Sequence, residues 1–544
     1  MTSNGHIESQ GEREVGVVIG GSLSRGVEVR LSRSRSVEDI AVGAYVSIEG
    51  QSNRSFGMIT DIRLESIDKS VETIVPDLDD PFVSDVLEGT AYYGMVDVLP
   101  TLIIDPTTGE SRPVRTVPRH FSRVVDANME DVRSVFGEAD ESHLSIGQPL
   151  AMENVDIVLD LKKVAERSVG VFGKSGTGKT FLVRQLLAGL VKSREAGVLV
   201  FDMHNEYGWS GTDRERGRQV KGLKQLFGSR IVVLTLDKAA SDRRGVPTDG
   251  EIRIGHDEIE PEDIEALTEA LGLTDAGRQL PFRLHSKYGR KWFTKFMSLD
   301  GEDMNELRAE MGEHEGTMQA LQRRLRAFER FGFITEDSGS GSVRSIVDYL
   351  QKGMSVVLEF GQYGRHELAY MLAANLLTRR IHEQYVSRSE RAMGEAGEEP
   401  KALVIAIEES HKFLSRGVAS QAIFGSIARE DRKHGVTLLV VDQRPSSIHD
   451  EVLSQIGTKL VCLLDSERDI EAILAGMSER SKLRNVLARL ESRQQALLMG
   501  DALPMPVVVQ TREYGSAESY AAFSITDAIE SSAAFTQERD ELFN

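Results

Sequence analysis

The residues best suited to chemistry form a glycine-rich stretch at positions 168–180, which reads SVGVFGKSGTGKT. It matches the pattern G-x-x-x-x-G-K-[ST], in which glycines let backbone N–H groups wrap around phosphate oxygens. Lys179 is expected to reach the β- and γ-phosphates, and Thr180 is expected to ligate Mg²⁺. The stretch therefore predicts a nucleotide site for ATP or GTP with Mg²⁺, against the alternative of a chance glycine loop.

The elements on either side of this loop are those that the motif requires. A short apolar strand precedes it, and the helix expected at 181–192 would point its N-terminus at the anion. We expect the nucleotide to contact one continuous run of residues: Gly173, Lys174, Ser175, Gly176, Thr177, Gly178, Lys179, Thr180 and Phe181.

Two adjacent carboxylates end a second buried strand. Residues 402–413 read ALVIAIEESHKF, and Glu408 and Glu409 are the first acidic residues in that run. At a strand end the chain can place one acid near Mg²⁺ and the next one against a water. We predict that Glu408 holds the metal, directly or through its waters, and that Glu409 polarises the attacking water. An acidic pair is a weak signal alone, and the phosphate loop in the same chain strengthens it.

Other polar residues follow apolar strands. Residues 196–207 contain a continuous apolar strand that ends in Asp202, with His204 and Glu206 just beyond it. Uninterrupted apolar strands that alternate with helices indicate a parallel sheet, and its ligands lie at the carboxyl ends of the strands. We expect Asp202, His204 and Glu206 near the nucleotide, with Asp202 as a further metal ligand, unless they form a solvated turn.

The run 427–446 contributes further candidates. Gln443 follows the strand at 436–441 and is predicted to sense the γ-phosphate or to position the water. Arg429 and Arg432 lie in the segment IAREDRKHG at 427–435. A guanidinium that stabilises the transferring phosphoryl group is often supplied by a neighbouring subunit, so both are candidates for that role. A structural salt bridge is the alternative for either arginine.

The whole chain limits the possible classes of protein. At 544 residues it is too long for one ordinary domain, and it has no apolar run of the length that a membrane span needs. We expect a cytoplasmic protein without a membrane partner. Cys462 is the only cysteine and allows no intrachain disulfide. The net charge of −20 argues against a surface that binds nucleic acid everywhere, but it does not exclude a locally positive channel.

The expected fold is α/β, with a P-loop ATPase core preceded by an N-terminal β-barrel. Short β segments at 15–20, 26–31, 45–49 and 56–62 predict the barrel. The expected domains are the barrel at 1–117, a connector at 118–154 with a helix at 129–136, the core at 155–512, and a C-terminal segment at 513–544.

A helical insertion is expected inside the core at about 257–335, with helices at 260–271, 304–311 and 317–331. Its arginines 323, 324 and 326 form either a solvated face or a nucleic-acid contact. A strand at 354–360, a helix at 367–386 and a surface loop at 387–400 are expected after it.

Taken together, these pieces resemble the HerA family of hexameric DNA-translocating ATPases, relatives of FtsK-type pumps in the additional-strand RecA-like class. The order and spacing of the motifs carry the resemblance: the phosphate loop, then 202–207, 408–411, 429–433 and 443–446. The resemblance implies a RecA-like core, a HAS-type barrel and a homohexamer with ATP at subunit interfaces and double-stranded DNA through the pore.

The resemblance also implies which segments of the chain contact neighbouring subunits or other proteins. It implies an arginine finger within 429–433, a C-terminal segment that braces the adjacent subunit, and a barrel that docks a NurA-type nuclease or an anti-phage defence effector. One departure is Glu408, where the family usually has Asp; we still expect an active ATPase because Lys179, Thr180 and Glu409 are present.

Alternatives remain at this point. An ATP-gated ring could activate a bound effector without moving along DNA, and both functions need the same nucleotide site. A metabolic P-loop kinase has no evident use for the barrel or the arginine segment. Lys221, Lys224 and Arg365 are candidates to touch DNA phosphates in the pore, or they are ordinary surface charges.

Overall fold

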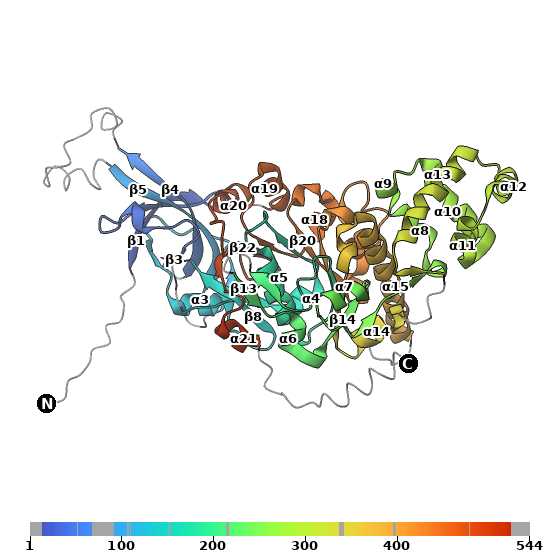
Figure 1. Cartoon of the computed structure of the whole chain (residues 1–544). Coiled ribbons are helices and arrows are strands. Elements are labelled where there is room, and N and C mark those ends of the chain that lie inside the picture. Colours follow the sequence, from blue (N-terminus) through green and yellow to red (C-terminus); the bar gives the residue numbers. More distant parts are fainter. Residues whose placement is uncertain are drawn as a thin grey trace. The chain divides into compact units, whose positions relative to one another are not determined.

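The computed structural model describes residues 13–51, 53–67, 92–105, 108, 110–150, 152, 154–213, 217–336, 342–394, 399–477 and 479–523. The chain forms two compact units, which Figure 1 colours along the sequence. Unit 1 comprises Met1–Asp160, Gly173–Gly178 and Lys459–Arg512. Unit 2 comprises Leu161–Phe172, Lys179–Thr458 and Glu513–Asn544.

Unit 1 begins with a closed antiparallel barrel, so the prediction of an N-terminal β-barrel is confirmed. Its strands follow the order β2-β1-β7-β3-β4-β5, and the pairing of β2 with β5 closes the ring, while β6 extends it from β5. The strand bounds are β1 Glu14–Ser22, β2 Gly26–Leu31, β3 Tyr45–Glu49, β4 Arg54–Ser66, β5 Tyr92–Ile104, β6 Ser111–Pro113 and β7 Arg123–Asp126.

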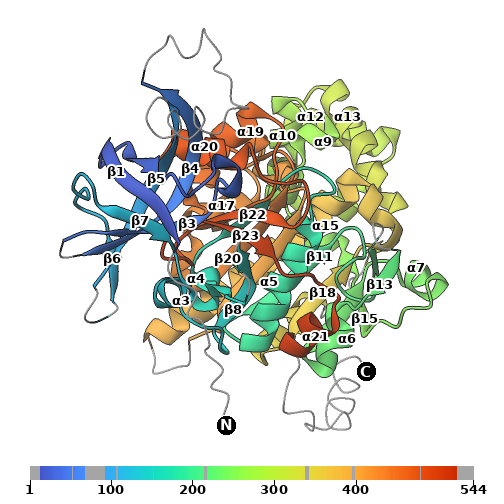
Figure 2. The ribbon, with the colours of Figure 1, turned by 90° about the vertical axis from the view of Figure 1, so that its left-hand side faces the viewer.

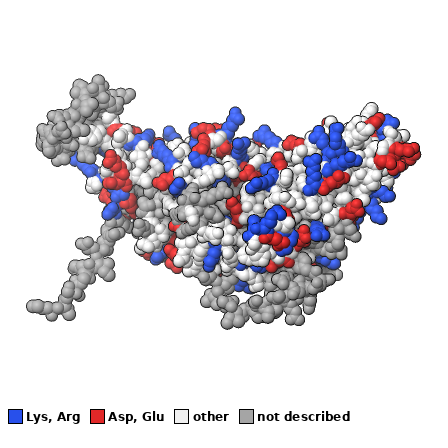
Figure 3. Space-filling view, viewed as in Figure 1, with Lys and Arg blue, Asp and Glu red and all other residues white. Residues whose placement is uncertain are grey.

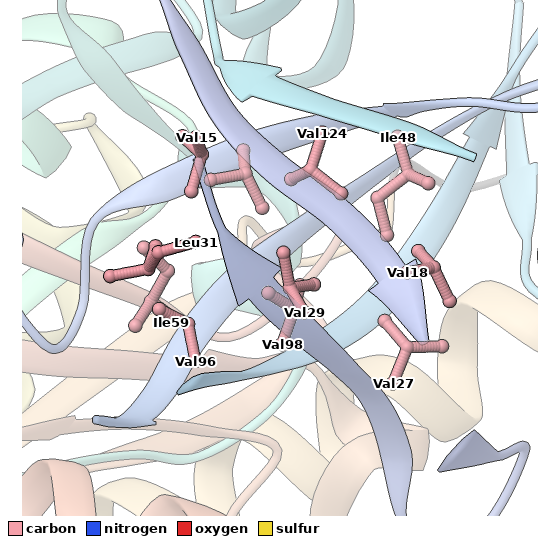
Figure 4. Close-up of a cluster of buried hydrophobic side chains, with 11 residues drawn as sticks. Val15, Val18, Val27, Val29, Leu31, Ile48, Ile59, Val96, Val98 and Val124 are labelled. Atoms are coloured by element: carbon pink, nitrogen blue, oxygen red, sulfur yellow. The ribbon is translucent and has the colours of Figure 1, made fainter. Parts of the chain in front are cut away.

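Alternating β-branched residues fill the barrel. Figure 4 shows side chains from several strands meeting in one cluster, among them Val18, Val29 and Val98, which are at most 1% exposed. Successive strand residues point to opposite faces, so the inward valines alternate with outward polar residues. A bulge after Phe56 bends β4, and a Cβ on Gly57 would lie 2.6 Å from the carbonyl oxygen of Leu99, which is why a glycine stands there.

The barrel extends beyond the boundary expected from the sequence. Strand β7 pairs with β1 and with β3, so the barrel reaches Asp126 rather than ending at residue 117. The predicted helix at 129–136 is confirmed as α3 Met129–Phe136, where Asn128 and Asp131 form a capping box. The expected connector also supplies β8 His143–Pro149, which pairs with β9 Ile157–Asp160.

The rest of unit 1 comes from the C-terminal part of the chain. Its strands follow the order β21-β22-β23-β8-β9, with β21 Thr458–Val461, β22 Gln495–Gly500 and β23 Val507–Thr511. Two helices accompany them, α19 Glu467–Ile473 and α20 Arg480–Leu487. Lys482 of α20 pairs with Asp97 of the barrel at 3.6 Å.

Unit 2 is built on a sheet with the order β15-β14-β18-β11-β19-β20-β10, in which every pair is parallel. This confirms the predicted α/β class. Apart from the short edge strand β15, which is partly exposed, these strands are buried, as their continuous apolar sequences require. Their bounds are β10 Val169–Phe172, β11 Gly197–Asp202, β14 Ile231–Thr235, β15 Gly250–Glu251, β18 Ser355–Glu359, β19 Leu403–Glu408 and β20 Val436–Asp442.

Helices connect these strands in unit 2. They include α4 Leu161–Glu166, α5 Lys179–Ser193, α6 Leu223–Phe227, α7 Lys238–Arg243, α14 Ser342–Gln351, α15 Glu367–Gly394, α16 His411–Leu414, α17 Ile423–Glu430, α18 Asp450–Gln455 and α21 Ala517–Phe523. None of the helices in the described ranges is both long and apolar enough to cross a membrane.

The stretch expected as a helical insertion is helical. It contains α8 Pro261–Glu265, α9 Thr268–Leu271, α10 Asp275–Tyr288, α11 Trp292–Met297, α12 Gly301–Met311 and α13 Glu315–Leu325. The single helix predicted at 260–271 is two helices, and the one predicted at 317–331 ends as the 3-10 turn Arg326–Arg330. In Figure 3, Lys and Arg side chains gather over the region where Figure 1 labels α9 and α13. Arginines 323, 324 and 326 are exposed, and their contact with nucleic acid stays a prediction.

One expected loop is wrong. Residues 387–394, expected in a surface loop, continue α15 without a break. Ser389 in this stretch is only 7% exposed, and Arg388 pairs with Asp348 of α14 at 3.6 Å. The composition of residues 387–394 favours a loop. Packing against α14 therefore keeps this polar stretch helical.

Candidate functional site

The phosphate loop has the backbone that its glycines predict. Gly173, Gly176 and Gly178 have φ values of +152°, +80° and +94°, a region that side chains disfavour. A Cβ on Gly173 would also lie 2.7 Å from the Cβ of Cys462. The hydroxyl of Thr177 donates to the carbonyl of Lys174 at 2.8 Å, and the Lys174 N–H donates to Leu463 at 3.0 Å. Glycine is therefore required for conformation at all three positions and for space at the first.

The structure gives Cys462 a packing role. It is buried next to Gly173, as expected for a cysteine in an apolar run. Lys174 of the same loop pairs with Asp465 at 2.9 Å, and Ser175 is exposed. The loop is thus held at its base by the segment that follows β21, while its tip remains accessible.

Helix α5 begins with the predicted lysine and threonine. It starts at Lys179, two residues before the predicted start, and Lys179 is 9% exposed. Phe181, predicted to contact the nucleotide, stacks on Tyr514 with ring centroids 6.3 Å apart, and the Arg184 guanidinium lies 5.7 Å from both rings. Tyr514 thus covers one face of the Phe181 ring. Contact of Phe181 with a nucleotide stays a prediction.

The C-terminal segment contacts its own chain in the part that the structure describes. Tyr514 and Phe523 are 3% and 4% exposed, and the Lys192 ammonium of α5 donates to the Ala522 carbonyl at 2.7 Å. Tyr514 and Phe523 are therefore buried within unit 2, whereas Ala517 and Ala521 are exposed, and bracing of an adjacent subunit by 513–544 stays a prediction. Residues 524–544 of that prediction lie outside the described residues.

The parallel register of unit 2 gathers the other candidates at one edge of the sheet. Phe172 of β10 pairs with Asp442 of β20, and Glu408 of β19 pairs with Val441. On the other side of β19, the last residue of β11 is Asp202. The carboxyl ends of neighbouring parallel strands form the crevice where α/β proteins bind ligands. The chain leaves β10 for the phosphate loop at this same edge.

Glu409 and Gln443 contact each other. The Gln443 amide donates to Glu409 Oε1 at 3.1 Å, although the two residues follow different strands. Glu409 has a φ of +48°, which is uncommon for a residue with a side chain and recurs at functional sites. The two residues predicted to handle the attacking water therefore lie together.

Glu408 has one oxygen that is satisfied and one that is not. The Tyr207 hydroxyl donates to Oε1 at 2.7 Å, and the Tyr370 hydroxyl donates to the backbone carbonyl of Glu408 at 3.0 Å. Oε2 is buried and has no hydrogen-bond partner among the described residues. Burial, and then the negative charge of Asp202, raise the pKa of Glu408 from 4.5 to about 8. An unpaired buried carboxylate oxygen is a ligand that fits Mg²⁺.

Asp202 accepts hydrogen bonds from the turn that follows it, and its role as a metal ligand stays a prediction. Its oxygens accept the backbone N–H groups of Glu206 at 2.8 Å, Tyr207 at 2.8 Å and Gly208 at 3.3 Å. The carboxylate is 0% exposed, and burial raises its pKa. Asp202 thus organises the turn that carries Tyr207 to Glu408, and the metal site proposed below omits it. Within the described ranges, no three His, Cys, Asp or Glu residues form a metal-binding group.

His411 and Asp442 were missed by sequence reasoning. Asp442 is 1% exposed and accepts from Ser410 Oγ at 2.9 Å, the His411 N–H at 2.7 Å and the Arg444 N–H at 2.8 Å, and its Oδ2 lies 3.0 Å from His411 Nδ1. The Asp442 contact raises the pKa of His411. Burial opposes ionisation of Asp442, but the His411 hydrogen bond lowers its pKa below the ordinary value. The signal available in the sequence was an acid at the tip of β20, directly before Gln443.

The remaining candidates are spread over unit 2. Arg429 is partly exposed, with Glu451 at 4.0 Å, and the side chain of Arg432 lies outside the described side chains. His204 is exposed, and the Glu206 carbonyl accepts from Arg184. Among the three pore candidates, Lys224 is tied to Asp249 at 2.9 Å and is only 16% exposed, whereas Lys221 and Arg365 are exposed.

The chain is similar to known proteins over most of its length. Residues 15–95 match the HAS barrel domain model, and residues 144–381 match the model described as helicase HerA, central domain. The DNA double-strand break repair helicase HerA of Pyrococcus furiosus is 25% identical over 427 residues, covering 73% of this chain and 74% of that protein. The protein of the same name from Saccharolobus solfataricus is 23% identical over 509 residues, covering 91% of each chain.

Among solved structures, the chain is similar to the bacterial conjugative coupling protein TrwBdeltaN70, with a TM-score of 0.47 and 13% sequence identity. The match covers 72% of this chain and 93% of that chain. The similarity rests instead on the two family models, which match in the order barrel then core, and on relatives that cover most of the chain. The barrel and the core of this chain are therefore similar to those of the HerA family.

Proposed function

We propose that this protein is an ATP-driven motor that moves along double-stranded DNA as a homohexameric ring, with a nuclease or a defence effector docked on its barrel. The observation that supports it most is the pairing of Glu409 with Gln443 next to Glu408, at the sheet edge from which β10 enters the phosphate loop. The relatives are named as DNA break repair helicases, which favours DNA as the track.

Each side chain of the site has its own role in ATP hydrolysis. Glu409 accepts the proton of the attacking water, and the Gln443 amide holds the Glu409 carboxylate in place at 3.1 Å. Lys179 at the start of α5 contacts the β- and γ-phosphates, and the loop N–H groups bind the phosphate oxygens. The His411–Asp442 contact orients the turn after Glu409, since Asp442 accepts from both the backbone and the ring of His411.

Thr180 and Glu408 would hold Mg²⁺. The buried Oε2 of Glu408, which has no hydrogen-bond partner in the described part of the chain, fits this role. The bound ion would neutralise charge on the β- and γ-phosphates. Tyr207 holds the other oxygen of Glu408 through a 2.7 Å hydrogen bond and so fixes the orientation of the carboxylate.

Two substitutions test the assignment of the nucleotide site. Lys179→Ala is expected to abolish nucleotide binding and hydrolysis, and Glu409→Gln is expected to retain binding while turnover falls by about 10²- to 10⁴-fold. Light scattering should show the same particle mass for both variants and the wild type. Ordinary turnover in Glu409→Gln would refute its role with the water.

Mixing experiments test whether an arginine acts across subunits. Of Arg429→Ala and Arg432→Ala, the variant that removes the finger should lose hydrolysis alone and should regain part of it when mixed with Lys179→Ala subunits. Arg416→Ala is a matched control, because Arg416 is exposed and pairs with Asp450 at 2.6 Å. Absence of rescue at every mixing ratio would count against a finger in this segment.

A roadblock assay tests movement. A motor should displace streptavidin from biotinylated duplex DNA in an ATP-dependent manner, and DNA should stimulate its hydrolysis. Activation of a bound effector without DNA, together with failure to clear the roadblock, would refute translocation and favour the ATP-gated scaffold.

A further inference from the structure

A basic segment of the barrel has a composition unlike the rest of this acidic protein. Residues 111–123 read SRPVRTVPRHFSR, with four arginines and one histidine and no acidic residue, in a chain of net charge −20. The segment comprises β6, the connection after it and the first residue of β7, and β6 is labelled at the margin of the barrel in Figure 2. We call residues 111–123 the basic segment.

An exposed aromatic ring lies within the basic segment. Phe121 is 77% exposed, and Val117 is 43% exposed. Phe121 also has a φ of +65°, an outlier for a bulky residue. Such backbone strain persists only where the surrounding structure imposes it, and it is concentrated at functional sites.

The backbone on both sides of Phe121 is clamped to β1. The Phe121 N–H donates to the Val18 carbonyl at 2.7 Å, and the Val18 N–H donates to the Ser122 carbonyl at 3.0 Å. Ser122 is only 3% exposed. The Ser122 N–H also donates to the Arg119 carbonyl at 3.2 Å, so both peptides of Phe121 are held, and the direction of its Cα–Cβ bond cannot change without breaking these bonds.

The guanidinium groups of the basic segment are available for an anion. Arg112 and Arg119 contact the neutral side chains of Asn53 and Gln51 at 3.2 and 3.3 Å. Arg115 is exposed, and no acidic partner of these three arginines exists among the described residues. Arg123 differs, since it pairs with Glu14 at 3.3 Å and with Glu49 at 3.6 Å.

We propose that the basic segment is a binding site for single-stranded nucleic acid, with a base stacked on Phe121 and phosphates bound by Arg115 and Arg119. Exposed aromatic rings among arginines provide such sites, because every base has a π face and every nucleotide has a phosphate. An acidic protein strand is disfavoured as the ligand, because Pro113 and Pro118 remove backbone donors that a pairing strand would need.

The test uses a fluorescent reporter at the site itself. Phe121→Trp in the full-length protein is titrated with a twelve-nucleotide oligothymidylate, and wild-type protein with Trp209 and Trp292 is the blank. Saturable quenching is expected, since a stacked base quenches indole fluorescence. Adding Arg115→Ala and Arg119→Ala to this reporter should weaken binding, and loss of two phosphate contacts should reduce the slope of log K against log salt by about 1.4.

Anisotropy of labelled oligothymidylate measures the contribution of the ring. Phe121→Ala should weaken binding by about 5- to 150-fold, the range for loss of one stacked base. The matched controls are Leu64→Ala, an equally exposed apolar residue at 79% on β4, and Arg25→Ala with Arg33→Ala, two exposed arginines of the same barrel. These controls should bind like the wild type.

Three results would overturn the proposal. They are no quenching at saturating oligonucleotide, quenching that is insensitive to salt and to loss of both arginines, or quenching by polyglutamate but not by DNA. The last outcome would assign the segment to an acidic protein partner. ATP hydrolysis stimulated by duplex DNA should persist in Phe121→Ala, so failure here is distinguishable from failure of the proposed motor function.

Discussion

Binding of Mg²⁺ and nucleotide should release a proton from Glu408. Burial and the Asp202 charge raise the pKa of Glu408 from 4.5 to about 8, so the carboxyl is mostly protonated at neutral pH without a cation. This difference corresponds to about 5 kcal/mol disfavouring the ionised form. A metal ligand must be deprotonated, so affinity is expected to rise about tenfold per pH unit below pH 8 and to level off above it.

Removing the Tyr207 hydroxyl should move this dependence to higher pH. The hydroxyl donates to Glu408 Oε1 at 2.7 Å and favours the ionised form. A hydrogen bond to a charged group contributes about 1.5–3 kcal/mol, so Tyr207→Phe should raise the midpoint by about one to two pH units. Tyr370→Phe is a matched control, because that hydroxyl is equally buried but donates to the Glu408 backbone carbonyl at 3.0 Å.

Calorimetry in two buffers of different ionisation enthalpy measures the protons released, with Glu409→Gln as the background to prevent hydrolysis. Protonation of the nucleotide phosphates is common to all variants, so differences between them report Glu408. The reasoning is refuted if the protein with Tyr207 and Tyr370 intact, in the Glu409→Gln background, releases no proton from Glu408 between pH 6 and 8. It is also refuted if Tyr207→Phe and Tyr370→Phe share the midpoint of the wild type.

Three further predictions follow from packing. Gly173→Ala should weaken nucleotide binding, measured by fluorescent ATP analogue, more than Gly176→Ala, because only the first Cβ meets another residue within 4 Å; equal losses would contradict this. Asp442→Asn should slow hydrolysis and leave nucleotide binding intact, because the turn after Glu409 loses an ionised acceptor; unchanged turnover would count against its positioning role. Arg379→Met should lower the free energy of unfolding of unit 2, measured in urea, by about 3–5 kcal/mol, because the buried Asp263 would lose the guanidinium that lies 2.6 Å from it. Adding Asp263→Asn should recover part of this loss.

Local patterns in the sequence were sufficient to predict the conformation of the phosphate loop and the fold class. The glycines of the phosphate loop, the apolar parallel strands and the valine-rich barrel strands each depend on neighbours in the chain. Glu408, Glu409 and Gln443 were predictable because polar residues that end buried strands must lie at the carboxyl edge of the sheet.

Other features depend on contacts between distant segments. Asp202 ends a strand just as Glu408 does, and only the structure distinguishes them: the turn after Asp202 supplies three N–H groups to its carboxylate, whereas an oxygen of Glu408 has no hydrogen-bond partner among the described residues. Strand β7 and the last two turns of α15 were missed because their partners, β1 with β3 and α14, lie far away in the sequence.

The sequence by itself thus determined the phosphate-loop motif and the conformation of its glycines, because both reside in residue types and short spacings. Only the tertiary structure decided which buried acid has an oxygen without a hydrogen-bond partner among the described residues, which tyrosine contacts that acid, and that the Phe121 ring of the barrel is exposed. Charge, hydrogen bonding and burial of a side chain depend on what the fold brings against it, and no local pattern records those neighbours.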